Sequence, residues 1–134
     1  MEGVKEINKR VLIIDDKESP RIGLSHLIKE NIGGYEVLTA NSAEKAIEIL
    51  LSGEKIDILL TDFRFRLKGR NGIELIRYIK IVFLDNIRTI LMSGLISKTD
   101  ERIAKEAGVD AILHKPFSLD VLAGTLRGLS SANL

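Results

Sequence analysis

The chain has 134 residues, of which 45% are hydrophobic, 29% are charged and 4% are aromatic. This length and hydrophobic content predict one domain with one packed core, and they exclude a disordered chain. Cysteine is absent, which excludes disulfide bonds and thiolate metal sites. The 20 basic and 19 acidic residues nearly balance, so neither the charge nor the few aromatic residues indicate nucleic-acid binding.

The sequence gives no indication of a membrane span or a secretory signal. No apolar run is long enough to cross a bilayer, and the first residues lack an apolar segment. We therefore expect no contact with membranes and a cytoplasmic location. We also expect a single domain over residues 1–134, with a core over residues 8–130 and short polar tails.

Strands and helices are expected to alternate five times along the chain. Short apolar runs predict strands, and longer segments with apolar residues at helical spacing predict helices. The expected strands are residues 10–14, 35–39, 56–62, 88–92 and 111–114. The expected helices are residues 20–32, 42–51, 72–84, 98–107 and 119–129.

Several polar residues mark the starts of the expected helices. Ser19 is expected to cap the first helix, with Pro20 at its first position, where a missing N–H costs nothing. Asn41, Ser97 and Ser118 are expected to begin the second, fourth and fifth helices.

This alternation predicts an α/β fold. Right-handed crossover connections between successive strands require a parallel sheet with helices on both faces. Four of the five expected strands are nearly continuous apolar runs, as strands covered on both sides must be. We therefore predict a doubly wound, three-layer α/β/α domain with a five-stranded parallel sheet.

Polar side chains stand where the expected strands end. Asp15 and Asp16 follow the first strand, Asp62 ends the third, Ser93 follows the fourth and Lys115 follows the fifth. The carboxyl ends of parallel strands share one edge, where open α/β sheets bind ligands. Three carboxylates there would repel one another, so a hard divalent cation such as Mg²⁺ is expected among them. A carboxylate can also attack phosphorus, with the lysine and the metal stabilising the transferred group.

Each of these residues has a simpler interpretation when it is taken alone. Asp62 and the Asp15–Asp16 pair could begin turns, and Ser93 could be an ordinary loop residue. Lys115 could belong to a turn that enters the last helix. These interpretations do not explain why all the positions follow strand ends at one edge of one sheet.

With these residues in place, the chain resembles the receiver domain of two-component response regulators. The resemblance spans about residues 8–130 and implies a flavodoxin-like fold with strand order 2-1-3-4-5. It implies that Asp62 accepts a phosphoryl group from the phosphohistidine of a sensor histidine kinase or phosphotransfer protein. Phosphorylation would then shift a conformational equilibrium that a downstream protein or output domain reads.

The resemblance also implies a metal site in the same cleft. Asp16 and Asp62 would bind Mg²⁺, or alternatively Mn²⁺, directly, together with the backbone carbonyl of Arg64. Asp15 would bind the ion through water.

The resemblance further implies which groups handle the phosphoryl group. Asp62, Lys115 and Ser93 would be the catalytic groups, with Lys115 and Ser93 binding phosphoryl oxygens and Ser93 shifting on activation. The peptide bond between Lys115 and Pro116 would be cis. Such a domain promotes its own phosphorylation and hydrolysis, so we do not expect an enzyme that turns over an external substrate.

Two features depart from the family pattern. Ile112 stands where an aromatic switch residue is common, which predicts a weaker or different conformational readout. The loop 63–71 is longer by two residues and lacks the usual proline. It is either a solvated loop or an attractor for an acidic phosphodonor. The basic residues of this loop are Arg64, Arg66, Lys68 and Arg70.

Two alternative functions stay open. A pseudo-receiver, which binds proteins without phosphorylation, is favoured by Ile112 and the atypical loop but opposed by the intact acids. A phosphohydrolase with an aspartyl-phosphate intermediate would commonly carry a second acid at the position of Arg64.

No DNA-binding or enzymatic output segment is expected after Leu129, so the output would be a protein contact or a domain removed from the chain. A homodimer through the fourth helix, fifth strand and fifth helix is a further expectation.

Overall fold

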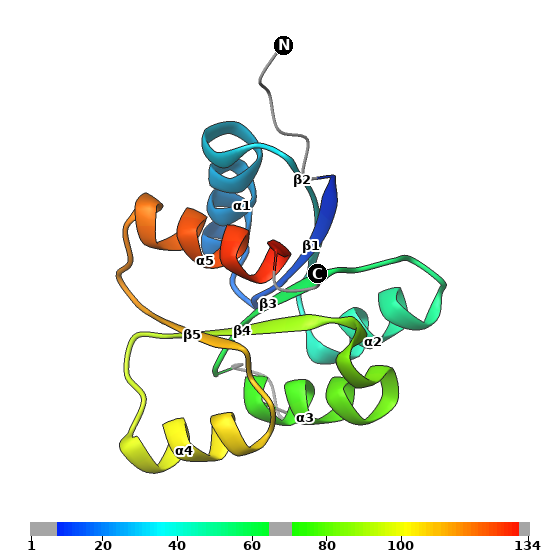
Figure 1. The fold of residues 1–134 in the computed structure, drawn as a ribbon, viewed down its shortest axis with the longest axis vertical. Helices are drawn as coiled ribbons and strands as arrows, with labels where there is room; N and C mark the ends of the chain where they lie inside the picture. Colours follow the sequence, from blue (N-terminus) through cyan, green and yellow to red (C-terminus); the bar gives the residue numbers. More distant parts are fainter. Residues whose placement is uncertain (1–7, 65–70, 132–134) are drawn as a thin grey trace.

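The computed structural model describes residues 8–64 and 71–131, which form a parallel sheet with helices on both faces (Figure 1). The strands are β1 (Lys9–Ile14), β2 (Tyr35–Ala40), β3 (Ile58–Asp62), β4 (Arg88–Ser93) and β5 (Ala111–His114). The α-helices are α1 (Glu18–His26), α2 (Ala43–Leu51), α3 (Gly72–Phe83), α4 (Lys98–Glu106) and α5 (Leu119–Ser131). A π-helix, η1 (Leu27–Ile32), continues α1, and a 3₁₀-helix, η2 (Leu84–Asn86), follows α3.

The sheet has the predicted topology. Its strand order is β2-β1-β3-β4-β5, and every neighbouring pair is parallel. Leu12 of β1 pairs with Leu38 of β2 on one side and with Leu59 of β3 on the other. This order confirms the flavodoxin-like, doubly wound fold. It places β1 and β3 side by side at the centre of the sheet, where the connections change direction.

The alternation of side chains along the strands divides the core into two apolar layers. On β1, Leu12 and Ile14 pack in the layer beneath α2, α3 and α4, whereas Val11 and Ile13 pack in the layer beneath α1 and α5. Figure 1 shows these two groups of helices on opposite sides of the sheet. All five residues of β3 are buried, which fits a central strand covered on both faces.

The predicted start of the first helix was wrong. α1 begins at Glu18, and Lys17 rather than Ser19 occupies the N-cap position. The first helical hydrogen bond runs from the N–H of Arg21 to the carbonyl of Lys17, at 3.3 Å. Pro20 therefore lies third in the helix, the last position at which a missing N–H removes no helical bond.

The remaining helix starts agree with the sequence except at α2. The hydroxyl of Ser42, and not Asn41, caps α2 by accepting a hydrogen bond from the N–H of Lys45 at 3.0 Å. Ser97 and Ser118 cap α4 and α5 as predicted. Among residues 8–64 and 71–131, no helix has the length and apolar content that crossing a bilayer requires.

Candidate functional site

The predicted site residues gather at the carboxyl edge of the sheet. Asp15 and Asp16 directly follow β1, Asp62 is the last residue of β3, and Ser93 is the last residue of β4. Lys115 comes one residue after the end of β5. The parallel register puts these strand ends next to one another, so residues far apart in the sequence share one site.

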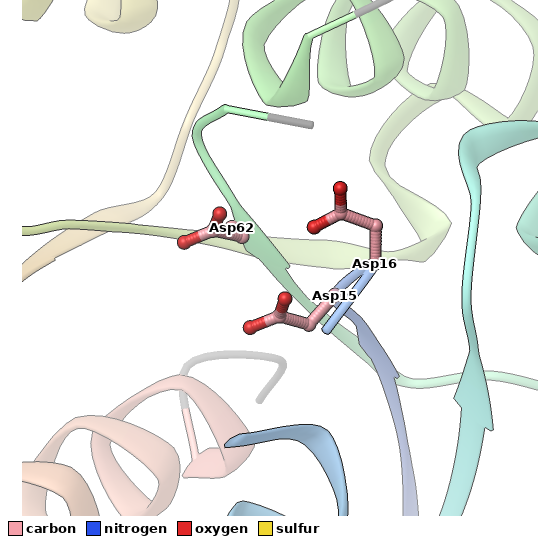
Figure 2. A group of neighbouring side chains, drawn as sticks. All are labelled: Asp15, Asp16 and Asp62. Atoms are coloured by element: carbon pink, nitrogen blue, oxygen red, sulfur yellow. The ribbon is translucent and has the colours of Figure 1, made fainter. Parts of the chain in front are cut away.

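Three carboxylates form an acidic cluster at the ends of β1 and β3 (Figure 2). One oxygen from each of Asp15, Asp16 and Asp62 lies within 4.8 Å of the others. Asp15 is 3% exposed and Asp62 is 9% exposed, so water screens their charges poorly. The cluster offers only oxygen donors, the ligand type that a hard divalent cation prefers. The donor set therefore fits a magnesium site.

The environment of Asp15 shows the electrostatic cost of this arrangement. Burial raises the pKa of the Asp15 carboxyl above its usual range, and the nearby charges of Asp62 and Asp16 raise it further. A hydrogen bond from the Lys17 N–H to Asp15 Oδ1, at 2.9 Å, and the charge of Lys115 act in the opposite direction. A cation held among these carboxylates would relieve the repulsion.

Lys115 pairs with the carboxylate at the end of β3. Its Nζ atom lies 2.7 Å from Oδ1 of Asp62, and its side chain is 37% exposed. The Lys115 N–H donates to the carbonyl of Ser93 at 2.8 Å, which ties the end of β5 to the end of β4. The peptide bond between Lys115 and Pro116 is cis in this structure.

Ser93 lies beside this pair. The residue is 4% exposed, and its hydroxyl oxygen accepts a hydrogen bond from the N–H of Leu95 at 3.2 Å. This bond fixes the turn after β4 and holds the hydroxyl at the floor of the cleft. The position suits a group that would donate to an oxygen of a ligand bound at Asp62.

The cleft above Asp62 has a volume of about 520 Å³. Its walls combine acidic, basic and apolar side chains from the loops that follow β1, β3, β4 and β5. The lining residues are Lys17, Asp62, Phe63, Arg64, Ser93, Gly94, Leu95 and Lys115. Sequence reasoning missed Lys17, Phe63, Gly94 and Leu95 as lining residues. Each stands one or two positions from a predicted site residue, and that adjacency was the available signal.

A family comparison agrees with this geometry. The family described as the response regulator receiver domain matches residues 11–127. This chain belongs to that family.

Two proteins of Bacillus subtilis are similar to this chain. Sporulation initiation phosphotransferase F of Bacillus subtilis is 28% identical over 121 residues, which cover 90% of this chain and 93% of that protein. The alkaline phosphatase synthesis transcriptional regulatory protein PhoP of the same organism is 28% identical over 113 residues, covering 84% of this chain but 44% of that protein. This chain thus spans about half the length of several curated relatives that it matches.

Solved structures of receiver domains share the fold. The structure of a response regulator receiver protein from Pseudomonas putida superposes with a TM-score of 0.81 at 26% identity, covering 90% of this chain and 97% of that one.

Two features depart from the family pattern, Ile112 and the loop 63–71, and the structure describes Ile112 and the first residues of the loop. Ile112 is partly buried and packs against the apolar layer beneath α2, α3 and α4, away from the cleft lining. Arg64 lines the cleft, with its guanidinium carbon 5.0 Å from the centre of the Phe63 ring. Its exposed side chain adds positive charge to the rim of the site. The other basic residues of the loop, Arg66, Lys68 and Arg70, lie outside the described residues.

Proposed function

We propose that this receiver domain accepts a phosphoryl group on Asp62 from a phosphohistidine, in a reaction that requires Mg²⁺. The observation that carries the proposal is the 2.7 Å contact between Lys115 Nζ and Asp62 Oδ1 beside two further carboxylates. The similar Bacillus subtilis protein is named a sporulation initiation phosphotransferase, which supports a phosphotransfer role. The donor would be a sensor histidine kinase or a phosphotransfer protein.

The chemistry would be a displacement at phosphorus. A carboxylate oxygen of Asp62 forms a bond to phosphorus while the bond between phosphorus and the imidazole nitrogen of the donor breaks. The electron pair stays on that nitrogen, and the donor histidine returns to its neutral or protonated form. The product is an acyl phosphate on Asp62, which water later hydrolyses.

Asp15, Asp16, Asp62 and the backbone carbonyl of Arg64 would hold the metal ion. When bound, Mg²⁺ would neutralise charge that builds on the phosphoryl oxygens and on the carboxylates. Without that neutralisation, the acidic cluster would repel an anionic donor.

Lys115 and Ser93 would orient the transferred group. The ammonium of Lys115 already lies on Asp62, so it can follow the charge that moves onto a phosphoryl oxygen during transfer. Ser93 lines the same cleft as Asp62 and presents its hydroxyl there. Both groups are fixed before the donor arrives, which reduces the reorganisation that transfer requires.

The output would be a shift between two conformations that a protein partner or output domain reads. The domain would act only on its own phosphorylation state, in the cytoplasm with its kinase, and would not be an enzyme for an external substrate. A homodimer through α4, β5 and α5 would be one form of readout.

Intact-mass spectrometry after incubation with Mg²⁺ and acetyl phosphate tests the proposal. We expect one added phosphoryl group, absent without Mg²⁺ and absent in Asp62→Asn. A single adduct that persists in Asp62→Asn would contradict the assignment of the acceptor.

A pseudo-receiver is the second candidate function, because Ile112 replaces the usual aromatic residue and packs as an ordinary core side chain. It predicts no adduct with any donor and no binding of Mg²⁺ in a calorimetric titration. Binding of Mg²⁺ without an adduct would instead indicate a receiver that needs its own kinase.

A further inference from the structure

The backbone that follows Asp62 is fixed from two sides. The N–H of Phe63 donates to the carbonyl of Met92 on β4 at 2.8 Å, and the carbonyl of Phe63 accepts from the N–H of Gly72 at 2.7 Å. One residue thus joins the end of β3 to both β4 and the start of α3. Its neighbours are Asp62 on one side and Arg64, whose carbonyl would complete the metal site, on the other.

Two reciprocal hydrogen bonds cap the start of α3. The side chain of Asn71 accepts from the N–H of Glu74 at 2.9 Å, and the side chain of Glu74 accepts from the N–H of Asn71 at 3.2 Å. This reciprocal pair is a capping box, which satisfies two N–H groups at the helix start. Gly72, the first residue of the helix, takes no part in these two bonds; its N–H donates to the carbonyl of Phe63 instead.

Gly72 is packed so closely that no other residue fits without movement. A Cβ atom there would overlap the backbone carbonyl oxygen of Asp62, and would lie 2.8 Å from Leu91 Cδ1 and 3.1 Å from Phe63 Cα. Two of these three atoms belong to the backbone and cannot rotate away. The glycine is thus required by close approach of two backbones, which is one of the reasons proteins use glycine.

We propose that Gly72 is a positioning residue for Asp62, acting through the backbone of Asp62 and Phe63. This inference rests on the proposed function. A side chain at position 72 would push α3 away from β3 or displace the end of β3. Either movement shifts Asp62 relative to Asp15, Asp16 and Lys115. Mg²⁺ demands near-ideal octahedral geometry, so a small displacement of one carboxylate should weaken its binding.

Gly72→Ala tests the inference, with two variants as controls. Loss of a group that supports metal ligands typically lowers metal affinity by about 10–100-fold, and we expect a loss in that range for Gly72→Ala. Asn71→Ala removes the adjacent cap but leaves the contact with Asp62, so it should lower Tm while keeping the Mg²⁺ affinity of the wild type. Gly124→Ala, at an open position on α5, should change neither the affinity nor the fold. Isothermal titration with Mg²⁺ and thermal unfolding give the two readouts.

A measurement on the wild type covers the case in which Gly72→Ala does not fold. If the Gly72 hydrogen bond supports metal binding, metal binding must by linkage stabilise that bond. Saturating Mg²⁺ should then slow hydrogen exchange of the Gly72 amide under conditions in which this amide exchanges faster than the Leu122 amide in α5, and therefore through a local opening. A local Gly72 exchange rate that Mg²⁺ leaves unchanged would overturn the inference.

The outcomes separate this inference from the proposed function. A wild type that binds no Mg²⁺ and takes no phosphoryl group would defeat the proposed function. A wild type that does both, with a folded Gly72→Ala variant of unchanged Mg²⁺ affinity, would defeat only the role of Gly72. An equal loss of Mg²⁺ affinity in Asn71→Ala and Gly72→Ala would also defeat it, because that result would indicate a general effect of helix stability.

Discussion

The Nζ atom of Lys115 lies 2.7 Å from Oδ1 of Asp62, although 53 positions separate the two residues in the sequence. The pair forms because β3 and β5 end at the same edge of the sheet, with β4 between them. It places a positive charge on the one carboxylate of the cluster that lines the cleft. The lysine thus compensates the charge of Asp62, and under the proposed function it would also stabilise a phosphoryl group transferred to that carboxylate.

Replacing this lysine should separate phosphoryl transfer from metal binding. In Lys115→Met, we expect the rate of phosphorylation by acetyl phosphate to fall by about 10²–10³-fold, the loss typical of removing one group that stabilises a developing anion. Binding of Mg²⁺ should be unchanged or tighter, because a cation beside the acidic cluster is removed. Mass spectrometry gives the rate and calorimetry gives the affinity.

Lys17→Met is the matched control for that experiment. Lys17 lines the same cleft but bonds Asp15 only through its backbone N–H, which the substitution keeps. We expect a much smaller loss of rate. Equal losses in both variants would indicate that the cleft needs positive charge in general, and not the pair with Asp62.

Neutralising one acid of the cluster should stabilise the protein when metal is absent. Burial raises the pKa of the Asp15 carboxyl above its ordinary value of 3.8, so the folded state holds this proton more tightly than the unfolded chain does. The free energy of unfolding therefore decreases as the pH rises from 3.8 through the raised pKa, and the full loss is present above the raised pKa. Asp15→Asn removes that loss. Each kcal/mol gained in the free energy of unfolding should raise Tm by about 3–5 °C in a chain of this size.

Thermal unfolding with and without Mg²⁺ checks the effect of Asp15→Asn. The variant should be more stable than the wild type without Mg²⁺ and should gain less from added Mg²⁺. Asp100→Asn provides a control with the opposite sign, because Asp100 lies in the first turn of α4, where the helix dipole favours a negative charge. A metal-free Asp15→Asn that is less stable than the wild type would contradict the repulsion within the cluster.

The residues at strand ends could be predicted from the sequence, because a buried strand and the polar residue that ends it are adjacent in the chain. Asp62 and Ser93 are of this kind. The start of α1 at Glu18 could not be predicted. Ser19 and Pro20 match the usual pattern of a helix start, whereas the helix begins where the backbone first takes helical angles. The contact between Gly72 and the Asp62 carbonyl is tertiary, and nothing in the order of residues reports such a distance.

Two polar networks at the opposite edge of the sheet were also missed, for the same reason. Lys80 and Asp110 form an ion pair at 2.9 Å across 30 positions, and Asp110 also accepts from the N–H of Thr89. Arg10 bonds Glu36 and Glu54 through one guanidinium. In the sequence these residues are ordinary surface charges. Only the folded chain gives them their partners.

Substitution of Ile112 should change how the domain reports phosphorylation. Ile112 is partly buried against the apolar layer beneath α2, α3 and α4, and it lacks the aromatic ring that would turn inward as a switch. In Ile112→Tyr, we expect larger amide chemical-shift changes on α4, β5 and α5 after phosphorylation than in the wild type. Nuclear magnetic resonance spectra of both proteins, with and without acetyl phosphate and Mg²⁺, give the comparison. Equal changes on that face would count against a weaker readout in the wild type.

Leu84, just after α3, combines an exposed apolar side chain with an unfavourable backbone. Its φ angle is +56°, a region that side chains disfavour, and the residue is 66% exposed, so little burial offsets the strain. We expect Leu84→Gly to raise the free energy of unfolding by about 1 kcal/mol in urea denaturation. Leu51→Gly, a leucine of similar exposure at the end of α2, should lower it by about 1 kcal/mol, because its backbone is helical. If both variants lose stability, the Leu84 backbone carries no relievable strain.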